Sequence, residues 1–320
     1  MNQGWRAFGF SCCRGAAVGM IREYWNPHVH VLQGNTQKRY EVTDLELFCT
    51  VHQPLDLGGT GIKTLQVGDS KDSFADYRDN TGDNISARNG RFSELTGHYF
   101  IWKNHRADAI GFCHYRRYLI PAGLSGWIKD TAEKPYVNQG IGGVGNYASG
   151  YIIPHEALQQ KLSETSYLDM LYESLQGTDV LLPLANQLPP GGFLQQYGNA
   201  HPVEPFFRML AQLAATDNAL ARDAHRFFTE HPLAHWNNLF VMRWEKFSEY
   251  CEFLFELLLQ LDDQLAPLDS VYQNRVCAFL SERLLNFWVW KNNLSVTELD
   301  WCMTQDIRDA AEDHQRKAAS

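Results

Sequence analysis

The sequence lacks the short motifs that identify the commonest nucleotide-binding and hydrolytic enzymes. It has no Walker-type phosphate loop, no GxGxxG that opens a helix after a strand, and no GxSxG nucleophile elbow. The HExxH and Cys-x-x-Cys signatures of zinc sites are also missing. These absences disfavour nucleotide hydrolases, dinucleotide oxidoreductases and serine hydrolases, and we do not expect a catalytic metal.

Positive charge is in short supply. Lys and Arg number 28 against 37 Asp and Glu, which gives a formal net charge of −9 at pH 7. An acidic surface repels polyanions, so we do not expect nucleic acid as a partner. Hydrophobic residues make up 44% and charged residues 20% of the 320 residues, which excludes disorder and leaves room for a large core. This length favours one large α/β domain.

Long apolar runs are missing too. The densest run, FLFELLLQL at 253–261, contains Glu256 and is far shorter than the roughly 20 apolar residues that span a bilayer. Arg14 interrupts the apolar part of the first 20 residues, so we do not expect a secretory signal. These features predict a soluble, cytoplasmic protein.

Cysteine usage points to the same compartment. The number of cysteines is odd, which does not suit a disulfide framework. We therefore predict reduced, buried thiols and no zinc site. The seven positions are Cys12, Cys13, Cys49, Cys113, Cys251, Cys277 and Cys302.

Short apolar runs alternate with helical patterns along most of the chain. Such alternation predicts a single α/β domain with a mostly parallel central sheet and C-terminal helices. Strands are expected at 45–51, 62–67, 107–113, 150–154, 179–183, 238–243 and 295–299. Helices are expected at 92–104, 244–266 and 270–292, the last two from apolar residues at helical spacing. We place the domain at 44–304, after an appendage at 1–43 and before a polar tail at 305–320.

One predicted strand ends in a cluster of polar and cationic side chains. The segment ADAIGFCHYRRYL at 107–119 runs into His114, Tyr115, Arg116 and Arg117. Ligands of open α/β sheets gather at the carboxyl ends of strands, and guanidinium groups match phosphate oxygens. Two interpretations stay open: the arginines hold an anionic ligand, or they pair with nearby carboxylates.

A second polar segment, YRDNTGDNISARN at 77–89, surrounds a glycine with short hydrogen-bonding side chains. Asp83 and Asn84 could recognise a ribose or a base edge, or the segment could be a turn followed by a helix N-cap. Glu94 follows at the start of the predicted helix, where it could serve a ligand or an internal ion pair with Arg116 or Arg117.

Several spaced motifs together resemble the DUF4422 family of bacterial polysaccharide glycosyltransferases. The resemblance covers roughly residues 45–300. It rests on TVHQP (50–54), DNTGDNIS (79–86), ELTGHYFIWKN (94–104), IGFCHYRRYL (110–119), HWNNLFVMRWEKFSEYCEFLF (235–255) and YQNRVCAFLSERLLNFW (272–288).

The resemblance implies a GT-A-like (Rossmann-like) fold and transfer of a hexose from a UDP-sugar to a carbohydrate acceptor. Galactofuranose is among the sugars linked to such domains. Capsule, lipopolysaccharide O-antigen or exopolysaccharide synthesis is the implied setting, with a lipid-linked glycan acceptor and peripheral association at the inner membrane. The alternative is a noncatalytic module that binds nucleotide or glycan, or a scaffold subunit of a polysaccharide-assembly complex.

The resemblance also suggests how the donor is held. Many GT-A enzymes place an Asp-x-Asp motif at a strand end, where it holds a divalent cation against the diphosphate. Here the equivalent position is His114-Tyr115-Arg116-Arg117, so cations stand where carboxylates are usual. Guanidinium groups can neutralise a leaving diphosphate, so we expect metal-independent transfer.

Other roles follow from the same resemblance. Thr50 and His52 end the first strand and are expected at the nucleoside, together with Asp83 and Asn84. Family members often have His-Lys at this strand end, whereas the chain has His52 followed by Gln53. Asn237, Asn238 and Glu94 are expected to contact donor-sugar hydroxyls.

An inverting transfer also needs a general base for the acceptor hydroxyl. Glu282, in AFLSERLL, is one candidate, although an ion pair with Arg283 would explain it equally well. His201 and Glu204, in YGNAHPVEP, are the rival candidates.

Overall fold

The computed structural model describes residues 44–68, 71–138, 147–268 and 270–305. The chain divides into two units, Met1–Tyr40 and Glu41–Ser320, and every element described below belongs to the second. The predicted appendage at 1–43 and nearly all of the predicted tail at 305–320 lie outside the described residues, as do Cys12 and Cys13.

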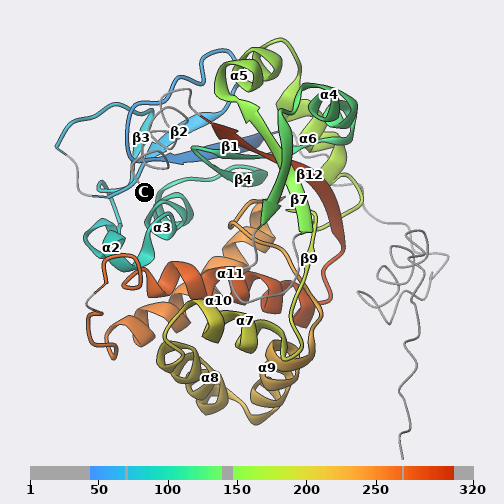
Figure 1. Ribbon diagram of the computed structural model, residues 1–320. Helices are drawn as coiled ribbons and strands as arrows, with labels where there is room; N and C mark the ends of the chain where they lie inside the picture. Colours follow the sequence, from blue (N-terminus) through green and yellow to red (C-terminus); the bar gives the residue numbers. More distant parts are fainter. Residues whose placement is uncertain (1–43, 69–70, 139–146, 269, 306–320) are drawn as a thin grey trace, which may run out of the picture. The chain divides into compact units, whose positions relative to one another are not determined.

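A large sheet forms the centre of this unit (Figure 1). Its strands follow the order β3-β2-β1-β4-β11-β8-β12-β7-β6, and β5 pairs with both β12 and β4. The bounds are β1 Leu45–Val51, β2 Lys63–Gln66, β3 Tyr77–Arg78, β4 Ala109–His114, β5 Arg117–Ile120, β6 Lys134–Asn138, β7 Tyr147–Pro154, β8 Val180–Pro183, β11 Phe240–Arg243 and β12 Val296–Gln305. Two short strands, β9 Asn186–Gln187 and β10 Leu233–Ala234, pair separately.

The sheet is mixed, so the prediction of a mostly parallel sheet is not confirmed. Parallel pairing joins β3, β2, β1 and β4 at one side and β8, β12 and β7 at the other. Between them, β11 runs antiparallel to both β4 and β8, and β5 runs antiparallel to both β4 and β12. The pairings β4-β11-β8-β12-β5 therefore close into a ring, because β5 turns back directly after β4.

Side-chain alternation along β1 explains how the sheet is covered on both faces. Leu47, Cys49 and Val51 point into a core with residues of α5 (His155–Ser163) and α6 (Tyr167–Leu175). Phe48 points to the other face, where its ring meets Phe112. Successive strand residues face opposite sides, so a strand buried on both faces appears as a continuous apolar run.

A second group of helices, α7 to α11, forms a separate layer, whereas η2 and α4 pack into the same core as α5 and α6. Figure 1 shows α7 to α11 gathered on one side of the sheet, where α10 also contacts β4 and β11. The bounds are η1 Ser86–Arg88, α2 Asn89–Phe92, α3 Leu95–Asn104, η2 Ala122–Leu124, α4 Ser125–Thr131, α7 Gly192–Ala200, α8 Glu204–Thr216, α9 Asn218–Glu230, α10 Trp244–Asp262 and α11 Val276–Lys291.

Two predicted helices begin later than the sequence pattern indicated. The helix expected at 92–104 is split, because Ser93 has a φ of 48° and ends α2 before α3 begins. The helix expected at 270–292 begins at Val276. The residues before it form a turn in which the Asn274 side chain accepts a hydrogen bond from the Leu268 backbone N–H at 3.1 Å.

The predicted burial of the thiols is confirmed where the structure describes them. Cys49, Cys113, Cys251, Cys277 and Cys302 are all free and buried. Within the described ranges, no helix has the length and apolar character needed to cross a membrane.

A buried histidine couples this fold to pH. His98 in α3 is only 2% exposed and packs against Phe112, with ring centroids 4.0 Å apart. Burial lowers the pKa of His98 to about 3 from an ordinary value of 6.5. In the unfolded chain His98 binds a proton as the pH falls below about 6.5, whereas in the folded protein it stays neutral. The free energy of unfolding therefore falls as the pH drops below that value.

We predict that His98→Phe weakens this pH dependence. Between pH 7 and pH 5 the wild-type protein should lose about 2 kcal/mol of unfolding free energy through His98, at about 1.4 kcal/mol per pH unit below the unfolded pKa. Urea unfolding at both pH values measures the difference. His225→Gln, at an exposed position of α9, is the matched control and should leave the difference unchanged. An equal loss in His98→Phe and wild type would contradict the assignment.

Candidate active site

A cleft of about 680 Å³ opens where the carboxyl ends of β1 and β4 face the helical layer. One wall, the sheet wall, consists of His52 and the turn His114–Arg117 between β4 and β5, with Glu94 ahead of α3. The other, the helical wall, comes from α7, α11 and the turns before β11 and α11. Of the predicted site residues, the cleft brings together His52, Glu94, His114, Arg116, Arg117, His201, Asn237 and Glu282.

Four guanidinium groups line this cleft. Arg116 and Arg117 belong to the sheet wall, and Arg275 and Arg283 to the helical wall. Arg116 stacks over the ring of Tyr115 at 4.7 Å and donates a hydrogen bond to its hydroxyl. Arg283 is only 2% exposed and lies between Tyr197 and Trp236, 5.4 and 4.8 Å from their ring centroids. The cleft thus concentrates positive charge in a protein whose net charge is −9.

Several buried polar atoms at the cleft have no hydrogen-bond partner among the residues that the structure describes. They are Nε of Arg117, Nε of Arg283 and Nδ1 of His114. In the described part of the chain, no carboxylate forms an ion pair with Arg117. Native structures rarely leave buried donors unpaired, so these atoms are candidates for contact with a polar or anionic ligand.

Burial, reinforced by the neighbouring guanidiniums, keeps His114 neutral. Burial, followed by the charges of Arg117, His52 and Arg116, lowers the pKa of His114 to about 2. The pKa of His52 is also lowered, chiefly by burial. Both imidazoles are therefore uncharged at pH 7, and each can donate one hydrogen bond and accept another.

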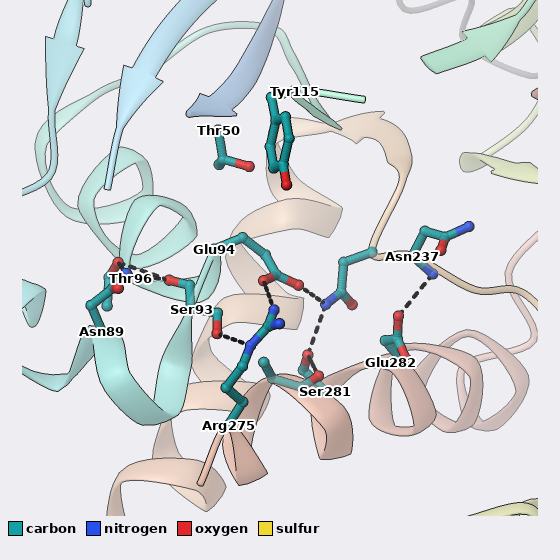
Figure 2. A network of polar contacts seen from close by, with 12 residues as sticks. Thr50, Asn89, Ser93, Glu94, Thr96, Tyr115, Asn237, Arg275, Ser281 and Glu282 are labelled. Atoms are coloured by element: carbon teal, nitrogen blue, oxygen red, sulfur yellow. Dashed lines mark hydrogen bonds and ion pairs between the residues drawn. The ribbon is translucent and has the colours of Figure 1, made fainter. Parts of the chain in front are cut away.

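A polar network spans the cleft floor and joins three segments far apart in the sequence (Figure 2). Asn238 donates from Nδ2 to Oε1 of Glu94 at 2.8 Å and to Oγ of Ser281 at 3.0 Å. Arg275 donates from Nε to Oγ of Ser93 at 2.8 Å, and its Nη2 lies 3.8 Å from Oε2 of Glu94. The predicted ion pair of Glu94 therefore exists, but its partner is Arg275 and not Arg116 or Arg117.

Strained backbone is concentrated at this network. Three of the four described non-glycine residues with φ in the left-handed region lie here: Ser93 at 48°, Asn237 at 76° and Asn238 at 50°; the fourth, Asn293, follows α11. Such conformations cost roughly 1–3 kcal/mol each and persist where the surroundings impose them, often at functional sites. Asn238 is only 4% exposed and already bonded to Glu94, so it holds the floor of the cleft and does not line it.

Glu282 projects from α11 toward the same turn, as Figure 2 shows. Its Oε1 accepts the backbone N–H of Asn237 at 3.0 Å, and its Oε2 pairs with Nη1 of Arg283 at 2.9 Å. The side chain keeps 22% exposure. Burial raises its pKa and outweighs the opposing effect of Arg283, which makes the carboxylate a stronger base than an exposed glutamate.

His201 lies on the helical wall, oriented by Gln273. Nε2 of Gln273 donates to the carbonyl of Ala200, so its Oε1 accepts from Nδ1 of His201 at 2.9 Å. This network assigns the proton of His201 to Nδ1 and leaves Nε2 as the acceptor. Burial lowers the pKa of His201 to about 4, which makes it a weak base. Glu204 is separated from it: it pairs with Arg208 on the exposed side of α8 and does not line the cleft.

Three of the residues expected at the nucleoside lie outside the cleft lining. Thr50 is buried, with its hydroxyl 3.5 Å from the carbonyl of Cys113. Asp83 and Asn84 form a turn before η1, in which Asn84 bonds to Gly82 and Tyr99 donates to Asp83. These contacts fit the turn interpretation of the segment.

Sequence reasoning missed Arg275, Arg283 and Trp236 as cleft residues. The two arginines stand in YQNRVCAFLSERLLNFW and Trp236 in HWNNLFVMRWEKFSEYCEFLF, and these two motifs of the family resemblance were the available signals. Within the described ranges, no group of three or more His, Cys, Asp and Glu side chains is arranged to hold a metal ion.

The chain is similar to one protein family in sequence and to one solved structure in fold. A family described as "Domain of unknown function (DUF4422)" matches residues 46–293. The apo structure of WbbM, a bifunctional glycosyltransferase, is similar with a TM-score of 0.67 and 25% sequence identity over 82% of this chain. The similar region is 45% of that solved chain, so the chain spans less than half of its length. No curated protein matches the sequence.

Proposed function

We propose that this chain, which belongs to the DUF4422 family, is a glycosyltransferase that moves a hexose from a UDP-sugar to a carbohydrate acceptor. The observation that carries this proposal is the cleft, in which the unsatisfied guanidinium donor of Arg117 stands across from the partly buried carboxylate of Glu282. A transferase needs both, because one group must neutralise the leaving diphosphate and another must accept a proton.

The donor diphosphate lies against Arg116 and Arg117, with His114 beside it. Nε of Arg117 is the donor without a partner, and a phosphate oxygen satisfies it. Arg275 adds a third charge, partly offset by Glu94. Negative charge grows on the diphosphate as the sugar leaves, and donors held in place before the reaction stabilise it without reorganisation.

This arrangement makes a divalent cation unnecessary. At the strand end where a metal would be held, the two guanidiniums repel a cation, and the neutral His114 offers a single ligand. The fixed cations supply the electrostatic stabilisation that a metal supplies elsewhere.

The sugar and nucleoside take the adjoining parts of the cleft. His52 and Tyr115 line the side nearest β1, where the nucleoside binds. The side chain of Asn237 faces donor hydroxyls, and the buried pair Glu94 and Asn238 supports the floor beneath them. Galactofuranose is the proposed sugar, a lipid-linked glycan the acceptor, and cell-surface polysaccharide synthesis at the inner membrane the setting.

Glu282 acts as the general base. Its carboxylate takes the proton of the acceptor hydroxyl as that oxygen bonds to the anomeric carbon and the bond from that carbon to the diphosphate breaks, releasing UDP. The backbone of Asn237 and the Arg283 guanidinium hold it in one orientation. His201 is the rival base, since its Nε2 is left as the acceptor on the same wall.

We predict that the purified protein releases UDP from a UDP-sugar and that EDTA leaves the rate unchanged. The guanidiniums already provide the charge that a metal would add. A coupled UDP assay on a panel of UDP-sugars, with and without EDTA, measures this. Loss of turnover in EDTA with recovery on adding manganese would contradict metal independence, and binding without turnover of any UDP-sugar would favour a noncatalytic binding module.

Arg117→Gln should weaken donor binding about 10- to 100-fold, because it removes one charge-assisted contact worth roughly 1.5–3 kcal/mol. Titration calorimetry with UDP measures the affinity. Arg222→Gln is the matched control, since it removes one positive charge from an exposed position of α9. Equal UDP affinity in Arg117→Gln and Arg222→Gln would reject the diphosphate role.

Glu282→Gln should lower kcat about 10²- to 10⁴-fold with little change in UDP affinity, because the amide cannot accept the proton. Glu252→Gln, at an exposed position of α10, controls for the lost charge. Circular dichroism of each variant checks the fold, since the amide offers one acceptor oxygen where two donors point. Near wild-type kcat in Glu282→Gln, together with a loss in His201→Gln, would transfer the base role to His201.

A further inference from the structure

Two large apolar side chains stand exposed at the rim of the cleft. Val271 is 88% exposed and Tyr272 is 51% exposed, and both line the cleft. Most residues of this size in the described chain are buried. Exposed apolar side chains beside convergent polar groups mark a contact surface for a ligand.

The ring of Tyr272 is supported from behind. Its centroid lies 5.1 Å from that of Phe279, which in turn stacks on His201 at 4.0 Å with an interplanar angle of 19°. His201 is tied to Gln273, the residue after Tyr272, so the turn and α7 hold the rings together. A supported ring loses little conformational freedom when a ligand covers its exposed face, which favours binding.

We propose that Tyr272, supported by Phe279 and His201, is the stacking surface for the ring of the acceptor sugar. This inference rests on the proposed function and names the part of the cleft that takes the acceptor. A sugar ring has an apolar face of C–H groups and a rim of hydroxyls. An exposed aromatic ring covers that face, while the hydroxyls stay free to meet polar groups of the cleft.

The position of Tyr272 assigns it to the acceptor and not to the donor. Both candidate bases, Glu282 and His201, belong to the helical wall that carries Tyr272. The attacking hydroxyl must reach one of them, so the acceptor ring has to lie along this wall. The donor diphosphate belongs to the opposite wall, with Arg116 and Arg117.

The test measures sugar binding separately from turnover. Methyl β-D-galactopyranoside is titrated into full-length protein saturated with UDP, and binding is followed by ligand-detected NMR. We expect saturation transfer to the sugar's C–H protons, about tenfold weaker binding in Tyr272→Ala, and near wild-type binding in Tyr272→Phe, which keeps the ring. Phe207→Ala, which removes a ring that is 53% exposed on α8 away from the cleft, is the matched control and should bind as wild type.

The outcomes separate this inference from the proposed function. Unchanged sugar binding in Tyr272→Ala, or no binding by the wild-type protein, overturns the acceptor surface even if UDP is released. Weaker UDP binding in Tyr272→Ala also overturns it, because the ring would then stack on the donor's base. A tenfold loss of sugar binding supports the surface even if no UDP-sugar is turned over, in which case the transferase proposal alone fails.

Discussion

The hydrogen bonds around the buried amide of Asn238 are the interaction on which the cleft depends. A buried polar group costs roughly 1–3 kcal/mol when it loses its partner, so Glu94, Asn238 and Ser281 must stay together. Glu94 precedes α3, Asn238 precedes β11 and Ser281 lies in α11, so one amide ties the sheet side of the cleft to the helical layer. The left-handed backbone at Asn237 and Asn238 is the strain that this arrangement imposes.

Ion pairs inside the cleft explain how a protein with a net negative charge keeps several arginines there. Glu94 offsets Arg275, and Glu282 offsets Arg283, so each carboxylate allows one guanidinium to stay inside. Arg117 has no such carboxylate in the described chain and leaves Nε unsatisfied. Among the described residues, the charge of Arg117 next to the end of β4 is therefore left without a carboxylate, and it is the charge that we propose meets the donor diphosphate.

Local patterns predicted the seven expected strands, although β12 continues to Gln305, but they missed β3, β5, β6, β9 and β10 and the connections between strands. Leu45–Val51 and Ala109–His114 are buried on both faces, so their apolar runs are visible in the sequence without any partner. The mixed pairing was not predictable, because the antiparallel insertion of β11 between β4 and β8 depends on where the chain crosses. The split at Ser93 was missed because a left-handed serine is imposed by its contacts, including the bond from Arg275, and not by its own propensity.

The family and the cationic cluster at the end of β4 are both readable from the chain, since His114 to Arg117 are consecutive residues after an apolar strand. Which distant groups join that cluster depends on the folded structure. It brings Arg275, Arg283 and Glu282 into the cleft, pairs Glu94 with Arg275, and leaves Glu204 on the exposed side of α8. The physical reason is that periodicity records which face of an element is buried, whereas the partner of that face is chosen by long-range packing and by the need to satisfy every buried polar group.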